Sequence, residues 1–190
     1  MAHPRSDFLM RRRLLLATAP AFFAAPALAR LGPELATGSV AKFALAKEPK
    51  PLPELAFTDG DDKPLALAGY KGKTVLLNFW ATWCAPCVKE MPSLDKLQAE
   101  MGKDGFIVLP LSLDTSSRPK VAPFYADRKL ANLGIYFDKG KKVMSALDVS
   151  VLPTSILIDV QGRELGRLEG EADWDKPEAL ALMKAAIPAG

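Results

Sequence analysis

Cys84 and Cys87 are the side chains of this 190-residue sequence best suited to chemistry, and they are its only cysteines. They lie between a strongly apolar run and a segment with helical spacing. Residues three apart on a helix share a face, so the two sulfur atoms can reach each other. A helix N-terminus favours a thiolate and lowers a thiol pKa from about 8.5 to roughly 3.5–7.5. The pattern predicts a redox dithiol in which Cys84 attacks a disulfide and the more buried Cys87 resolves it.

Three other interpretations of the cysteine pair remain open at this point. A permanent disulfide across so short a loop would constrain little of the unfolded chain, so it would add little stability. A structural metal site needs two more ligands, and the only histidine is His3, close to the N-terminus. The two thiolates would suit Cu(I), a soft ion, although the sequence has no methionine-rich run beside them.

The cysteines follow a predicted strand and precede a predicted helix. The β-branched and apolar run Thr74–Trp80 hardly alternates, which is typical of a strand buried on both faces. Apolar residues at spacings of three and four predict a helix over Pro86–Met101. Further strands are expected at Gly105–Leu113, Ile135–Phe137, Ser155–Asp159 and Glu164–Leu168, and further helices at Lys120–Leu130, Val143–Leu147 and Pro177–Ala186. This order predicts an α/β protein with a mixed central sheet and helices on both faces.

Two polar stretches of the domain have simple structural interpretations. A turn at residues 59–62 between Phe57 and Leu65 predicts a short β-hairpin that precedes the central strand. Residues 114–117 follow a predicted strand, and we expect them to start the next helix, one of them serving as its cap.

Residues 1–29 are typical of a secretory signal peptide. The positively charged Met10–Arg13 precedes an apolar run, and Ala27–Ala29 matches the small-x-small pattern of a cleavage site. The arginine pair before the apolar run resembles a twin-arginine export signal. We expect cleavage and a periplasmic protein, with membrane anchoring by residues 10–29 as the alternative. Residues 30–53, which contain four prolines, are expected to form a leader or linker, and residues 54–187 the folded domain.

The net charge of the chain says little about its partners. The formal charge is +3, but residues 1–29 hold four arginines and one aspartate, and the remainder has 21 basic and 21 acidic residues. A neutral domain does not favour nucleic acid as a partner. The sequence has no glycine-rich phosphate-binding pattern, so no organic cofactor is expected; the redox-active group would be the Cys84–Cys87 disulfide itself.

The stretch NFWATWCAPCVKEMP, residues 78–92, resembles the motif of the TlpA/ResA/CcmG group of exported thiol-disulfide oxidoreductases. The resemblance continues through residues 151–159 (VLPTSILID) to 174–180 (WDKPEAL) and covers about residues 53–187. It implies a thioredoxin fold with an N-terminal β-hairpin extension. No bound organic cofactor is implied, and no residue is expected to bind a metal.

The resemblance assigns roles to residues around the cysteines. Pro153 matches a cis-proline that faces the cysteine pair, with Leu152 presenting its backbone to an extended substrate and Thr154 beside it. The alternative is an ordinary trans proline at a strand edge. The substrate-contact surface would be completed by Trp83, Ala85 and Pro86. For Trp83, the alternative is a half-buried packing residue.

Two further residues are candidates for supporting proton transfer. Asn78 occupies the place of a buried aspartate in cytoplasmic thioredoxins, and an amide cannot act as a general base. Glu90, three residues past Cys87 on the same helix, could take that role, directly or through water. The sequence alone favours a simpler interpretation of Glu90 as an exposed helix carboxylate.

The predicted function is specific reduction of protein disulfides. Ala85 and Pro86 add no charge between the cysteines, and the resemblance implies a reductant. By family, the clients would be copper-delivery or copper-site proteins of cytochrome oxidase assembly, or apocytochrome c. A membrane thiol reductase of the DsbD/CcdA type would supply electrons. The alternatives are a general disulfide oxidase or isomerase, a peptide-binding chaperone, and a Cu(I) carrier.

Overall fold

The strand β4, Thr74–Trp80, lies at the centre of the sheet, and each of its seven residues is buried. It pairs in parallel with β5, Phe106–Ser112, and antiparallel with β7, Thr154–Ile158. Side chains on both faces of such a strand meet apolar neighbours, which explains its unbroken apolar sequence. The computed structural model describes residues 30–103, 105–115 and 118–188.

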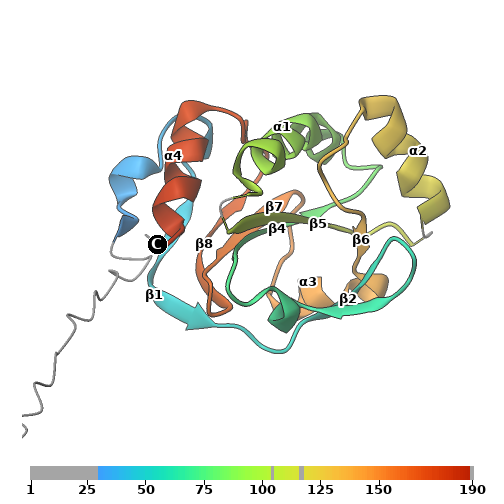
Figure 1. The fold of residues 1–190 in the computed structure, drawn as a ribbon, viewed down its shortest axis with the longest axis horizontal. Coiled ribbons are helices and arrows are strands. Elements are labelled where there is room, and N and C mark those ends of the chain that lie inside the picture. Colours follow the sequence, from blue (N-terminus) through green and yellow to red (C-terminus); the bar gives the residue numbers. More distant parts are fainter. Residues whose placement is uncertain (1–29, 104, 116–117, 189–190) are drawn as a thin grey trace, which may run out of the picture.

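Within these residues, eight strands form one mixed sheet in the order β1-β8-β7-β4-β5-β6-β2-β3 (Figure 1). The hairpin of β2 and β3 precedes the central strand along the chain and confirms the expected N-terminal extension. The hairpin of β7 and β8 is antiparallel, as its turn sequence predicts. The remaining strands are β1 (Ala44–Pro51), β2 (Ala56–Asp59), β3 (Pro64–Ala66), β6 (Tyr136–Phe137) and β8 (Arg163–Glu169).

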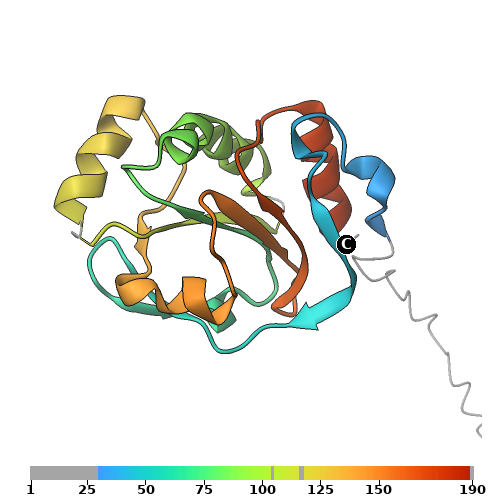
Figure 2. The ribbon, with the colours of Figure 1, turned by 180° about the vertical axis from the view of Figure 1, so that it is seen from behind.

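Helices cover both faces of the sheet, as predicted. The helices α1, α2 and α4 lie on one face and α3 on the other (Figures 1 and 2). Their bounds are Ala85–Met101 for α1, Arg118–Arg128 for α2, Lys142–Ala146 for α3 and Pro177–Ala186 for α4. Short 3-10 turns span Pro33–Leu35, Gly38–Val40, Leu67–Tyr70 and Lys139–Lys141. The fold is the thioredoxin-type α/β arrangement that the sequence predicts.

The segment expected to be a leader contributes an edge strand. Strand β1 pairs antiparallel with β8, with Ala44 opposite Arg167 and Lys50 opposite Glu164. Before it, Val40 and Phe43 are buried in the core beneath α4. A proline cannot donate to a ladder, but an edge strand has one side without a partner, so it tolerates proline. Part of the expected leader therefore packs against the domain, through β1 and the buried Val40 and Phe43.

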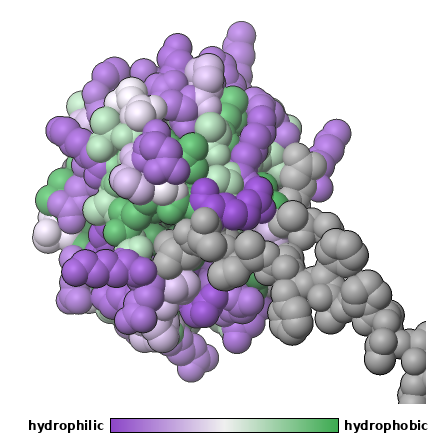
Figure 3. Space-filling model, turned by 90° about the vertical axis from the view of Figure 1, so that its left-hand side faces the viewer, coloured by the Kyte–Doolittle hydropathy of each residue, from purple (hydrophilic) through white to green (hydrophobic). Residues whose placement is uncertain are grey.

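The face that carries α4, β1 and the N-terminal turns is mostly hydrophilic, with apolar side chains gathered near its middle (Figure 3). Partly buried apolar residues of these elements include Leu35, Leu45 and Ile187. The expected signal peptide, residues 1–29, lies outside the described residues. Across the part of the chain that is described, no helix has the length and apolar character needed to cross a membrane.

Candidate active site

The cysteine pair lies where β4 turns into α1. Cys84 is the N-cap of α1, and a disulfide bond joins it to Cys87, with 5.3 Å between the two Cα atoms. The backbone N–H of Cys87 points at Cys84 Sγ, at an N···S distance of 3.4 Å. Cys84 keeps 7% of its surface exposed, whereas Cys87 is fully buried. Only Cys84 can therefore be approached from solvent, and the helix terminus favours its thiolate.

The loop before Cys84 is fixed at several points. The Leu113 N–H donates to the Trp80 carbonyl at 2.9 Å, so pairing between β4 and β5 continues one residue past the end of β5. The Cys84 N–H donates to the Ala81 carbonyl at 3.1 Å and closes a turn. Between these points, the carboxylate of Asp114 accepts hydrogen bonds from the N–H and hydroxyl of Thr82. Sequence reasoning grouped Asp114 with the start of the next helix, and the 32-residue separation from Thr82 gave no signal of this contact.

The apolar residues that flank Cys84 in the chain are exposed to solvent. Trp83 is 64% exposed and Val151 is 44% exposed, the two large apolar side chains that stand out in this way among the described residues. Ala85 and Pro86 are also exposed. The interpretation of Trp83 as a half-buried packing residue is therefore wrong. An exposed indole directly beside a reachable sulfur is available for contact with a protein substrate.

Pro153 directly precedes β7 in the chain. The Leu152–Pro153 peptide bond is cis, as expected. Thr154 lies opposite Phe79 of β4, which brings this end of β7 to the same end of the sheet as the cysteines. Pro153 and Thr154 are buried and Leu152 is partly buried. The Thr154 hydroxyl donates to the Val151 carbonyl at 2.8 Å and fixes the turn that carries Val151.

Glu90 is buried, so its interpretation as an exposed helix carboxylate is wrong. Only 2% of its surface is exposed. One carboxylate oxygen accepts from Asn78 Nδ2 at 2.8 Å; the other accepts from the Ala172 N–H and Trp174 Nε1, each at 3.1 Å. The residue lies three positions after the buried Cys87, on the same face of α1. The donors from residues 172 and 174 are more than 80 positions away, so the sequence did not reveal them.

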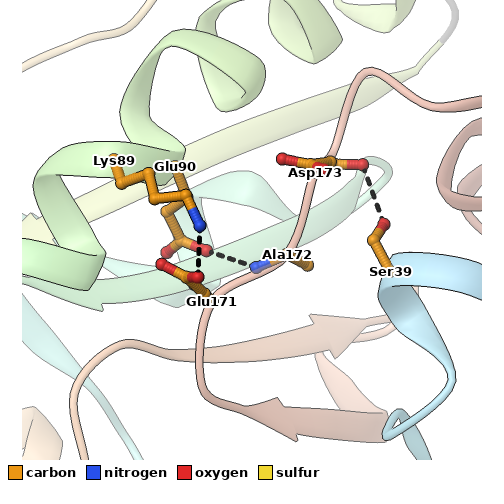
Figure 4. Close-up of a pocket in the computed structure, with 6 residues that line it drawn as sticks. All are labelled: Ser39, Lys89, Glu90, Glu171, Ala172 and Asp173. Atoms are coloured by element: carbon orange, nitrogen blue, oxygen red, sulfur yellow. Dashed lines mark hydrogen bonds and ion pairs between the residues drawn. The ribbon is translucent and has the colours of Figure 1, made fainter.

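Burial raises the pKa of Glu90 to about 7, although the hydrogen bonds from Ala172, Asn78 and Trp174 act in the opposite direction. A cavity of about 150 Å³ adjoins the carboxylate and is lined by Ser39, Lys89, Glu90, Glu171, Ala172 and Asp173 (Figure 4). In this view, Lys89 pairs with Glu171 beside the buried Glu90. A cavity of this size with polar walls can hold water. The carboxyl group is thus able to exchange a proton near neutral pH.

Comparisons with known proteins agree with this geometry. The profile of the Redoxin family matches residues 47–183. The chain belongs to the Redoxin family. The thiol-disulfide oxidoreductase ResA of Bacillus cereus is 37% identical to this redoxin over 129 residues, which is 68% of this chain and 73% of the relative. The chain is therefore a thiol-disulfide oxidoreductase of the ResA and DsbE type.

Solved structures show the same fold. A protein from Chlorobium tepidum, described as a putative thiol:disulfide interchange protein DsbE, aligns with a TM-score of 0.66 and 28% identity. That alignment covers 74% of this redoxin and 98% of the other chain. A protein from Corynebacterium glutamicum, described as a secreted thiol-disulfide isomerase, aligns with a TM-score of 0.63 and 25% identity, covering 75% and 92% of the two chains.

Proposed function

We propose that this redoxin reduces disulfide bonds of specific protein clients outside the cytoplasm. The observation that carries the proposal is the arrangement of the pair: a reachable Cys84 among exposed apolar side chains, with a fully buried Cys87 behind it. A protein client can cover Trp83 and Val151, and its disulfide then meets Cys84. Leu152, cis-Pro153 and Thr154 are proposed to hold an extended segment of the client beside the sulfur.

The reaction is an exchange of sulfur–sulfur bonds. The Cys84 thiolate attacks one client sulfur, a Cys84–client bond forms, and the second client sulfur leaves as a thiolate that takes up a proton. Cys87 then loses its proton and attacks Cys84 Sγ, which closes the Cys84–Cys87 disulfide and releases the first client sulfur. Two electrons have passed to the client, and the two cysteines carry them without an added cofactor.

Glu90 is the proposed acceptor of the Cys87 proton, directly or through water. Its position on the same face of α1 and its pKa of about 7 support this role. Asn78 cannot take up the proton, but its amide N–H holds Glu90 in place. The deprotonated carboxylate is the active form, so the resolving step is expected to slow as the pH falls below about 7.

The proposed clients are copper-delivery or copper-site proteins of cytochrome oxidase assembly, or apocytochrome c. A membrane thiol reductase of the DsbD/CcdA type is the proposed source of electrons. The signal-like residues 1–29 and the similarity to a secreted protein of Corynebacterium glutamicum support action in the periplasm. A Cys87→Ser variant tests the clients, because it stops the exchange at the mixed disulfide and leaves each true client covalently attached to Cys84.

The reduction potential of the pair tests the direction of the reaction. Equilibration of the purified protein against a dithiothreitol series should give a value near or below about −230 mV, towards the thioredoxin end of the known range. A Cys84→Ser variant should lose all disulfide reduction, while its fold stays intact because serine is close to cysteine in size and shape. A Cys84→Ser protein with full reductase activity would contradict the mechanism.

A disulfide oxidase or isomerase is the second candidate, favoured by the similarity to the Corynebacterium glutamicum protein, which is described as an isomerase. A measured potential near about −120 mV would support it, because the reduced pair would then be strongly stabilised. The protein would in that case form disulfides in a reduced client rather than break them.

A further inference from the structure

The loop of residues 81–83 connects β4 to α1 and carries Trp83 into solvent. Its two ends are tied to the framework through Trp80 and through the turn from Ala81 to Cys84. Those contacts leave Thr82 and Trp83 between the fixed points. The orientation of the exposed indole therefore depends on what holds Thr82.

Asp114 holds Thr82 from the end of the neighbouring strand. The carboxylate is only 6% exposed. One oxygen accepts from the Thr82 N–H at 2.9 Å and from the Ser112 hydroxyl at 2.9 Å, and the other accepts from Thr82 Oγ1 at 2.7 Å. Hydrogen bonds to an ionised carboxylate are short and strong, and a buried one that loses a donor is costly. Asp114 thus links the end of β5 rigidly to the loop that precedes Cys84.

The indole of Trp83 has no comparable anchor of its own among the described residues. Its side chain is 64% exposed, next to a Cys84 that keeps only 7% of its surface exposed. An indole that is mostly exposed gains little from burial, so its position depends mainly on the backbone on either side. On one side is Thr82, held by Asp114; on the other is Cys84, the N-cap of α1.

We propose that Asp114 and Thr82 are positioning residues that fix the loop 81–83 so that Trp83 docks a protein client while Cys84 attacks its disulfide. The inference deepens the proposed function and rests on it. Neither residue supplies an atom to the exchange reaction. A small disulfide needs only the Cys84 sulfur, whereas a protein disulfide also needs the docking surface in place. The two residues therefore determine selectivity for proteins over small disulfides.

The test compares two substrates in the same variants of the full chain. Reduction of insulin reports a protein disulfide, and the reaction of the reduced protein with glutathione disulfide reports the thiolate alone. Asp114→Asn removes the charge that strengthens these hydrogen bonds and leaves one acceptor oxygen where the carboxylate has two. We therefore expect kcat/KM for insulin to fall roughly tenfold or more. The rate with glutathione disulfide should change less than about threefold, because the Cys84 sulfur stays in place.

The matched control is Asp95→Asn. Asp95 is a buried carboxylate of α1 that also accepts three hydrogen bonds from neutral donors, but these come from Asn132 and Leu133. This control should lower the Tm by an amount similar to Asp114→Asn and leave the ratio of the two rates unchanged. Thr82→Ser keeps both donors and should retain the wild-type ratio.

If Asp114→Asn does not fold, a milder variant still tests the proposal. Thr82→Val removes only the hydroxyl donor and should lower the insulin rate selectively, by a smaller factor. A double variant with Asp114→Asn should lose no more than Asp114→Asn alone, because both changes act through one contact. Equal losses for both substrates, or an unchanged insulin rate in a folded variant, would overturn the positioning role.

The activity of the wild-type protein distinguishes a failure of the proposed function from a failure of the positioning role. A wild type that reduces neither insulin nor glutathione disulfide contradicts the proposed function itself. An active wild type accompanied by an Asp114→Asn variant with the same rate ratio contradicts only the role of Asp114 and Thr82.

Discussion

Glu90 places an ionisable carboxyl group in the core. The groups that donate hydrogen bonds to it are all uncharged. Asn78, the Ala172 backbone and the Trp174 indole donate to it, and Glu171 nearby raises its pKa further. Asn78 Oδ1, in turn, is buried and has no hydrogen-bond partner among the described residues. A protonated carboxyl is easier to bury than a carboxylate, so folding favours the protonated form of Glu90.

This preference gives the protein a pH-dependent stability near neutrality. The pKa of Glu90 is raised from 4.5 to about 7 on folding, so the folded state holds a proton that the unfolded state loses. Stability from this group is fully present below about pH 4.5 and is lost as the pH rises through about 7, by on the order of 3 kcal/mol at most. Urea unfolding of the oxidised protein between about pH 5 and 8 measures the slope.

Glu90→Gln should remove that slope. The neutral amide can accept from Ala172 and Trp174, and Asn78 can turn its amide so that its free oxygen accepts from the new N–H group. The control is Glu100→Gln, which changes a half-exposed carboxylate on the same helix. A Glu90→Gln protein whose stability still falls with pH as steeply as the wild type would show that another group titrates.

At the scale of elements, the edge strand β1 depends on a close approach to β8. Gly166 lies opposite Leu45, and a Cβ added there would lie 2.6 Å from the Ala44 carbonyl oxygen and 2.7 Å from a ring carbon of Phe43. Glycine is required at this point because the backbones of the two strands and the Phe43 ring leave no room for a side chain.

Gly166→Ala should therefore push β1 away from β8. We expect a loss of about 1–3 kcal/mol in the free energy of unfolding, measured by urea denaturation. Hydrogen exchange should become faster in residues 44–51 before the rest of the sheet is affected. Gly69→Ala is the control, since a Cβ at Gly69 meets nothing within 4 Å. Equal stabilities of the two variants would mean that β1 adjusts without cost.

At the scale of the whole molecule, the segment before β1 packs into the same core as α1 and α4. Phe43 is 5% exposed and lies in the same cluster as the α1 and α4 side chains. Phe43→Ala should lower the free energy of unfolding by about 3–5 kcal/mol, with a single transition in thermal and urea unfolding. Lys42→Ala, at an exposed neighbour, should stay within about 0.5 kcal/mol of the wild type. An unchanged Phe43→Ala protein would show that the segment folds independently of the domain.

Much of this architecture could be predicted from local sequence. The helix α4 begins and ends at the residues predicted for it, because burial of one helix face requires apolar residues at regular spacing. The strand β4 coincides with its apolar run, because both of its faces are buried. Strand β1 could not be predicted. Its prolines argue against a central strand, and the sequence does not show that β8 has a free edge with which this segment can pair. The burial of Glu90 and the hydrogen bonds from Thr82 to Asp114 depend on partners that are distant in sequence, and no local pattern predicts such contacts.

The three tryptophans lie in different environments, so their intrinsic fluorescence can report on separate events in the protein. Trp83 stands in water at the docking surface, Trp80 is fully buried beside Phe124 and Tyr125, and Trp174 donates to the Glu90 carboxylate. A client that covers the active site would shift the emission of Trp83 to shorter wavelength and leave the buried indoles unchanged. Ionisation of Glu90 would act on the Trp174 indole through its hydrogen bond. Docking and proton transfer would thus have separate spectral signatures without an added label.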